Sequence, residues 1–146
     1  MLERTLMFVK PDHYHLYVPI LEMVDPLGKR VAEGPVEKVS RDKIAEHYIS
    51  HQNQRHYLLL VDHFVDRSIF LAVYEGEGIV QKVLDLAGPT DPSKAGKDTV
   101  RGRFSDDSLE LSRKEGRIVR NVVHRASSSE EAKREIEIWD SYLVWK

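Results

Sequence analysis

The chain has 146 residues, which is about the size of one domain. It is 41% hydrophobic and 32% charged, which fits a globular protein, because a disordered chain has too few apolar residues to offset its ordering entropy. Lys and Arg total 22 and Asp and Glu total 24, so the net charge is −2. This balance argues against a protein that coats polyanions but permits a local phosphate site. The lack of cysteine excludes disulfides, thiolate metal sites and cysteine nucleophiles.

Membrane and targeting signals are missing from the sequence. No apolar run approaches the roughly 18 residues of a membrane helix, and the first residues carry no signal-peptide pattern. There is also no internal repeat and no Gly/Ser linker. We therefore expect a single domain over residues 1–146, in the cytoplasm and without a membrane partner.

The apolar pattern predicts alternating strands and helices. Ser40 is a candidate N-cap of the second helix, and Ser128 with Glu131 a capping box before the last, whose inner stripe would be Ala132, Ile136 and Trp139. Only residues 65–67 separate two strand signals, which suggests a hairpin. We expect strands at 5–9, 57–64 and 68–74, weaker strands at 31–39 (an edge strand) and 118–124, helices at 17–24, 41–51, 79–87 and 130–139, and an irregular stretch over 88–120.

This order of elements predicts an α+β fold. Strands and helices alternate around a central hairpin, as in the ferredoxin-like split βαβ motif. We expect a ferredoxin-like α/β sandwich whose four-stranded antiparallel sheet is covered by helices. A long loop in so small a domain is usually functional or locally disordered.

Several side chains suited to phosphate chemistry stand at predicted strand ends and in this loop. Lys10 and Arg101 supply charge for phosphate oxygens, and Asn121 can hold a sugar hydroxyl. A neutral His124 can attack phosphorus or move a proton near pH 7. Each residue alone is more often a surface or core residue, and seven histidines make any one of them weak support.

In combination, these residues resemble the nucleoside diphosphate kinase family. Lys-Pro-Asp, Thr-(Ile/Val)-Arg-Gly and Asn-x-x-His are highly specific together, and all matches keep the family order over nearly the whole chain. The matching segments are residues 3–12, 47–48, 60–61, 75–76, 88–92, 99–102, 121–124 and 135–136.

The resemblance implies a ping-pong transfer of a γ-phosphoryl group from a nucleoside triphosphate to a nucleoside diphosphate. His124 would be the nucleophile, Glu135 would orient its ring, and Tyr48 would position it. Magnesium would be held through the nucleotide phosphates, with no direct protein ligand. The implied nucleotide-binding positions are Lys10, His56, Leu60, Leu84, Thr90, Arg101 and Asn121, with Asp12 as a less certain helper.

Four features depart from the family pattern. Arg125 and Ala126 replace the glycine and serine that follow the histidine, so Glu135 would act directly or through water, and Ser127 is a possible substitute. Leu84 stands where an arginine usually reaches the phosphates, and Arg125 is a candidate replacement. His56 stands where an aromatic ring usually stacks on the base. Residues 105–120 form a longer charged segment, either a solvated insertion or a substrate lid or assembly contact.

Two alternatives to an active kinase remain open. Ala126, Leu84 and Arg125 are compatible with a nucleotide-binding regulatory module that has weak or lost catalysis. A ferredoxin-like nucleic-acid-binding module would display basic and aromatic residues on an open sheet, which the net charge and the strand aromatics disfavour. The resemblance also implies a homo-oligomer, either a tetramer or a hexamer, and acceptance of both purine and pyrimidine nucleotides.

Overall fold

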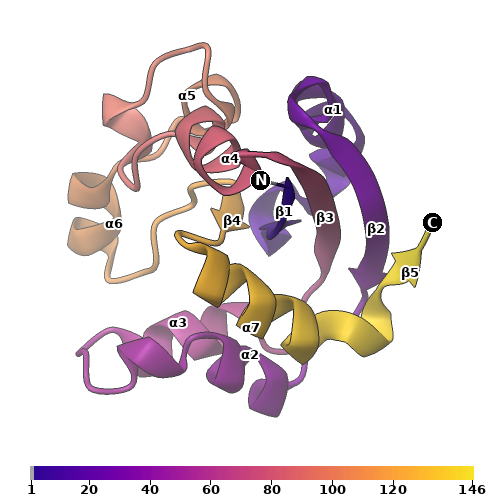
Figure 1. Cartoon of the computed structure of the whole chain (residues 1–146). Coiled ribbons are helices and arrows are strands. Elements are labelled where there is room, and N and C mark those ends of the chain that lie inside the picture. Colours follow the sequence, from indigo (N-terminus) through magenta and orange to yellow (C-terminus); the bar gives the residue numbers. More distant parts are fainter. Residues whose placement is uncertain (1) are drawn as a thin grey trace.

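A five-stranded antiparallel sheet lies at the centre of the computed structural model, which describes residues 2–146 (Figure 1). The spatial order is β4-β1-β3-β2-β5. The two central strands, β1 and β3, pair over eight residues of each strand, from Leu2 opposite Glu77 to Val9 opposite Phe70. The strands are β1 (Leu2–Val9), β2 (Lys29–Val36), β3 (Ile69–Glu77), β4 (Val123–Arg125) and β5 (Val144–Trp145).

Helices cover both faces of this sheet (Figure 1). Helices α2, α3 and α7 contribute to one core cluster, and α1 and α4 to the other. The helices are α1 (Tyr17–Val24), α2 (Arg41–His47), α3 (Tyr57–Phe64), α4 (Ile79–Ala87), α5 (Val100–Phe104), α6 (Leu109–Glu115) and α7 (Ser129–Trp139).

Alternation along the central strands explains why there are two cores. In β1, Leu6 and Phe8 point to the α2/α3/α7 side, whereas Met7 and Val9 point to the α1/α4 side. Successive strand side chains face opposite sides of a sheet, so a strand covered on both faces is apolar at every position. The sequence prediction of a fully buried strand at residues 5–9 is confirmed.

The α+β fold with a helix-covered antiparallel sheet is confirmed, but the sheet has five strands instead of four. The additional strand, β5, pairs with β2 at Ala32 and Glu33, so β2 is not the edge strand that we expected. Gly34 permits the close approach of this C-terminal segment, because a Cβ there would lie 2.1 Å from the backbone oxygen of Tyr142.

The predicted hairpin of residues 57–64 and 68–74 is wrong, because residues 57–64 form helix α3. Leu60, Val61 and Phe64 of this helix are buried, while Leu58 and Leu59 are exposed. A short, continuously apolar run does not distinguish a helix from a buried strand by periodicity. The second half of the prediction is correct, since β3 begins at Ile69.

Residues 88–120 are more ordered than the sequence predicted. They contain α5, α6 and a short 3-10 turn at Pro92–Lys94. Buried Asp107 anchors the segment, because its carboxylate accepts two hydrogen bonds from Arg117, at 2.7 and 2.9 Å, and one from the Arg120 backbone N–H. This paired carboxylate gives the charged insertion a defined conformation.

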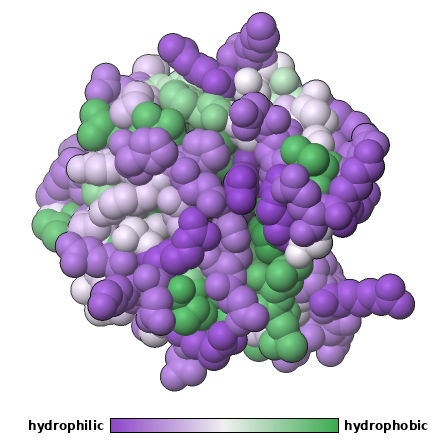
Figure 2. All heavy atoms as spheres, turned by 180° about the vertical axis from the view of Figure 1, so that it is seen from behind, coloured by the Kyte–Doolittle hydropathy of each residue, from purple (hydrophilic) through white to green (hydrophobic). Residues whose placement is uncertain are grey.

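The surface opposite the view of Figure 1 is predominantly hydrophilic, with apolar side chains in separate groups (Figure 2). No helix within residues 2–146 is long and apolar enough to cross a membrane.

Candidate active site

His124 lies in edge strand β4, opposite Phe8 of β1, and its ring stacks on the Phe8 ring with centroids 4.9 Å apart. The backbone just before it is strained, since Val122 has a φ of 75°, a left-handed conformation that β-branched residues rarely adopt. Such strain persists only where surrounding contacts hold it, and it is concentrated at functional sites. The side chain of His124 is 13% exposed, so its ring is held in place yet accessible.

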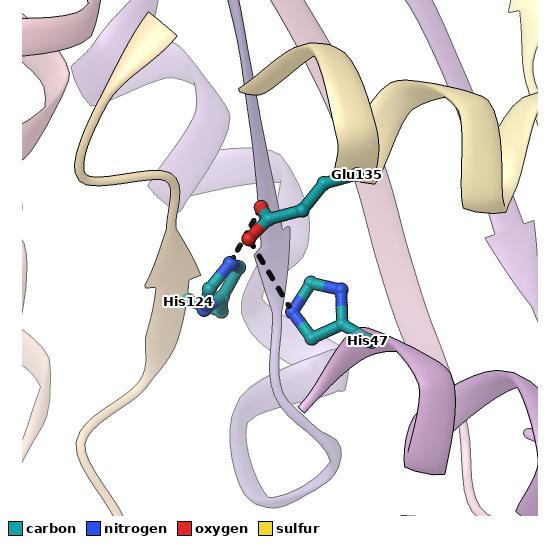
Figure 3. Close-up of side chains that lie close together, drawn as sticks. All are labelled: His47, His124 and Glu135. Atoms are coloured by element: carbon teal, nitrogen blue, oxygen red, sulfur yellow. Dashed lines mark hydrogen bonds and ion pairs between the residues drawn. The ribbon is translucent and has the colours of Figure 1, made fainter. Parts of the chain in front are cut away.

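Glu135 of α7 directly contacts the imidazole of His124 (Figure 3). The distance from His124 Nε2 to Glu135 Oε1 is 2.8 Å, so Nε2 carries the ring proton and donates a hydrogen bond to the carboxylate. In a neutral ring, the other nitrogen, Nδ1, is then an unprotonated acceptor. The sequence left open whether Glu135 contacts His124 directly or through water, and the contact is direct.

His47 of α2 lies beside this pair; the sequence placed it in a matching segment but assigned it no role in the site (Figure 3). The Trp139 indole N–H donates to His47 Nδ1 at 3.0 Å, which places the proton of the neutral His47 ring on Nε2. His47 Nε2 lies 4.0 Å from Glu135 Oε2 and has no hydrogen-bond partner among the described residues. Its N–H dipole therefore faces the carboxylate that holds His124.

Burial sets the protonation of this cluster. It lowers the pKa of the His124 imidazole well below its ordinary value, and the nearby charges of Lys10, Arg125 and Arg101 lower it further. Burial also lowers the pKa of His47, with an added contribution from His124. Burial raises the pKa of the Glu135 carboxyl. Both rings are consequently neutral at pH 7, as a nucleophilic imidazole must be.

Lys10 provides the first cation near His124. It follows β1, is 8% exposed, and its Nζ donates to Asn121 Oδ1 at 2.7 Å. Burial, together with the charges of Arg101 and Arg125, lowers the pKa of the Lys10 ammonium to about 7. An anion placed here would restore its charge, because an opposite charge favours the protonated amine.

Arg101 of α5 is buried and turned toward backbone carbonyls. Its Nε, Nη1 and Nη2 donate to the carbonyl oxygens of Asn121, Gly88 and Val123 at 3.1, 2.9 and 2.8 Å. Arg101 therefore holds together the segments before and after the insertion. Asn121 adds to this link, because its amide donates to the backbone oxygen of Thr90 at 3.1 Å.

A cavity of about 470 Å³ opens in front of His124, within the usual size range of small-molecule sites. It includes nearly every position expected from the sequence. Leu84 is the exception among the expected nucleotide-binding residues: it is half-buried on α4 and does not line the cavity. Asp12 also lies outside, where it pairs with His63 and Arg67. The expected residues that line it are Lys10, Tyr48, His56, Leu60, Thr90, Arg101, Asn121, His124 and Glu135.

Residues 105–120, the insertion, supply one wall of this cavity; the sequence left open whether they are a solvated insertion or a substrate lid or assembly contact. Mixed charges in residues 105–120 gave no sign of which side chains face inward. Wall residues from this segment are Leu109, Ser112, Arg113, Arg117, Ile118 and Val119. The remaining lining residues are His47, Ser50, His51, Arg125, Ser127 and Glu131. The sequence offers Arg125 as a candidate replacement for the missing arginine and Ser127 as a possible substitute for the missing serine.

The donor atoms of the site do not form a magnesium cage. One ligand atom each from His47, His124 and Glu135 lie within 4.8 Å of one another. Magnesium prefers oxygen ligands in octahedral geometry, whereas two of these groups are imidazoles and Glu135 already accepts from His124. Glu131 is the other carboxylate lining the cavity. This donor set suits an ion that arrives with its own oxygen ligands.

Comparisons with known proteins agree with this geometry. Residues 3–141 match the family model described as nucleoside diphosphate kinase. Proteins of that name from Staphylococcus carnosus and Bordetella petrii are 33% and 34% identical, over 94% and 92% of this chain and 87% and 89% of theirs.

Solved structures give the same result. A transition-state mimic of nucleoside-diphosphate kinase from Borrelia burgdorferi, with bound vanadate and ADP, superposes with a TM-score of 0.90 and 29% identity, covering 99% of this chain and 92% of that one. A halophilic nucleoside diphosphate kinase from Halobacterium salinarum in complex with CDP gives a TM-score of 0.80 at 27% identity, with 99% and 93% coverage.

Proposed function

Because the chain belongs to the nucleoside diphosphate kinase family and is therefore a phosphotransferase, we propose that it works through a phosphohistidine at His124. One observation carries this assignment. Glu135 accepts a hydrogen bond of 2.8 Å from His124 Nε2, which leaves Nδ1 as the basic nitrogen. The cavity that His124 lines also contains Lys10, Arg101 and Arg125.

The reaction divides into two half-reactions at one nucleotide site. The Nδ1 lone pair attacks the γ-phosphorus of a nucleoside triphosphate, and the bond from that phosphorus to the β–γ bridging oxygen breaks. The nucleoside diphosphate leaves with that electron pair. A terminal oxygen of a second diphosphate then attacks the phosphorus, and the P–N bond breaks to restore neutral His124. Throughout, Glu135 holds the Nε2 proton and stabilises the positive charge that phosphorylation places on the ring.

Cationic groups stabilise the charge on the transferring phosphoryl group. Lys10 and Arg101 supply charge, and Thr90 adds a hydroxyl at the cavity edge. Tyr48 packs edge-on against His124 with ring centroids 5.8 Å apart, and burial raises the pKa of its phenol, so the hydroxyl stays a donor. Asn121, which already holds Lys10, is assigned to the ribose on the resemblance.

Nucleobases would be held by stacking and apolar contact at His56 and Leu60. His56 is exposed on the cavity rim, and Leu60 is buried. Neither residue reads hydrogen-bonding edges of a base, so purine and pyrimidine nucleotides should both be accepted. Magnesium would be coordinated by nucleotide phosphates and neutralise part of their charge.

Labelling with γ-labelled ATP tests the proposal. Wild-type protein should form an acid-labile, base-stable phosphoprotein, and the label should pass to an added nucleoside diphosphate. His124→Ala should abolish both steps, whereas His15→Ala, which changes an exposed histidine outside the cavity, should retain them. Nucleotide binding without labelling of wild type would instead identify a regulatory module, and label retained by His124→Ala would refute the nucleophile.

Assembly and location complete the proposal. The resemblance supports a homo-oligomer, a tetramer or a hexamer, and a cytoplasmic enzyme. Light scattering coupled to size exclusion measures the first, and cell fractionation the second.

A further inference from the structure

Arg125 is a half-buried cation that forms no ion pair with residues 2–146. It ends β4, directly after His124, and its backbone pairs with Met7 of β1. Within residues 2–146, no carboxylate lies within ion-pair distance of its guanidinium, and its Nε is buried without a hydrogen-bond partner. Its recorded hydrogen bond is a long one, from Nη1 to Ser127 Oγ at 3.4 Å.

Three other cations of the cavity, Lys10, Arg101 and Arg117, are already engaged. Arg101 uses all three nitrogens on backbone carbonyls, and Lys10 donates to Asn121. The donor fork of Arg125 is nearly free although the side chain is half-buried, whereas Arg113, which also lines the cavity, is exposed on α6, where water satisfies its donors. A buried donor that lacks a partner destabilises the protein unless a ligand satisfies it.

Electrostatics defines what that ligand must be. The charge of Arg125 lowers the pKa of Lys10, Arg101 and His124, so Arg125 interacts electrostatically with both of the other cations and with the nucleophile. Burial lowers the pKa of Arg125, and the charges of Glu131 and Glu135 partly offset this effect, but neither carboxylate pairs with the guanidinium. The charges of Lys10, Arg101 and Arg125 repel each other until an anion enters, and a planar guanidinium binds phosphate oxygens in a bidentate manner.

We propose that Arg125 binds the terminal phosphates of the bound nucleotide, the β-phosphate of a diphosphate and the γ-phosphate of a triphosphate. The inference rests on the proposed transfer through His124, because the guanidinium of Arg125 lines the same cavity as this nucleophile. Arg125 thus supplies a contact for which Leu84 of α4 has neither the charge nor a place in the cavity wall.

Binding measurements separate this role from a structural one. Arg125→Gln should weaken ADP by about tenfold to a hundredfold, the usual effect of losing hydrogen bonds to a charged group, while adenosine affinity measured by NMR stays within about twofold. Arg125→Lys should fall between, because it keeps a charge but loses the planar fork. Arg41→Gln removes an exposed arginine of α2 that pairs with Asp62 outside the cavity, and it should bind ADP like wild type.

Each outcome bears on the proposal. Unchanged ADP affinity in Arg125→Gln would overturn it, and so would an equal loss of ADP and adenosine binding, because the side chain would then not act through the phosphates. Because this test measures binding, it is independent of turnover. A wild-type protein that labels His124 normally while Arg125→Gln binds ADP normally would leave the proposed function standing and remove only this inference.

Discussion

The indole N–H of Trp139 donates a hydrogen bond of 3.0 Å to Nδ1 of His47, and through it fixes which nitrogen of His47 faces Glu135. Both side chains are buried, at 0% and 2% exposure. The hydrogen bond orients the His47 ring beside Glu135, the carboxylate that holds His124.

Trp139→Phe should destabilise the protein by roughly 2–4 kcal/mol. It leaves His47 Nδ1 as a buried acceptor without a donor and removes part of a fully buried ring. Urea denaturation measures the change. Trp145→Phe is the matched control: Trp145 donates to Asp140 Oδ1 at 3.0 Å but is 40% exposed, so its loss should cost about 1 kcal/mol or less. Equal losses in the two variants would contradict a special role for the buried pair.

Glu135→Gln should slow phosphorylation of His124 by on the order of 10²–10⁴-fold. A glutamine amide can donate to His124 Nε2, which moves the ring proton onto Nδ1, and it cannot stabilise the charged phosphohistidine. Single-turnover labelling with γ-labelled ATP measures the rate. Glu137→Gln changes an exposed carboxylate on the same helix and should label at the wild-type rate. A wild-type rate in Glu135→Gln would show that this carboxylate does not act on the ring.

Stability should fall as the pH is lowered from 7 to 5. The pKa values of His47 and His124 are lowered by burial below the ordinary 6.5, so below that pH the unfolded chain binds protons that the folded chain does not. The two rings contribute fully to the free energy of unfolding above about pH 6.5. Below that pH, each ring lowers this free energy by up to about 1.4 kcal/mol per pH unit. Urea denaturation at several pH values gives the slope.

A matched pair of variants assigns that slope. His47→Gln removes one of the two titrating rings and should reduce the slope, whereas His15→Gln, at an exposed position, should leave it unchanged. An undiminished slope in His47→Gln would show that His47 does not contribute to it.

ADP binding should take up a proton at pH 8. The pKa of Lys10 is lowered to about 7, so the free protein holds much of it as the neutral amine at this pH, and an entering phosphate recharges it. Calorimetry in buffers of different ionisation enthalpy should report an uptake approaching about one proton. Lys10→Gln should lose this uptake, and Lys82→Gln, exposed on α4, should keep it. Binding heats that do not depend on the buffer would refute the prediction.

The sequence predicted best what depends on local patterns. Ser40 and Ser128 cap their helices as expected, by accepting from Lys43 N and Glu131 N. Glu131 also reaches back, but to the N–H of Ser127, one residue before the cap. These interactions lie within four residues of chain, so spacing alone determines them.

Tertiary contacts could not be predicted from the sequence. Glu135 shares its helix with Lys133 and Arg134 and resembles a solvated position, yet it is 1% exposed because α7 turns it toward His124. Ile136, expected on the inner stripe, is only half-buried. Helical spacing gives the width of a buried face, but packing against the sheet decides which residues occupy it.

Asp107→Asn should loosen the cavity wall formed by the insertion. Asp107 is 6% exposed and holds the guanidinium of Arg117, a wall residue, through two hydrogen bonds. An amide offers one acceptor oxygen in place of two and no charge, so amide hydrogen exchange over residues 105–120 should accelerate, and the KM for nucleotide should rise several-fold. Asp106→Asn, at the exposed neighbouring position, should change neither quantity. If exchange accelerated while KM stayed constant, the insertion would be a solvated surface element that does not help to hold the nucleotide.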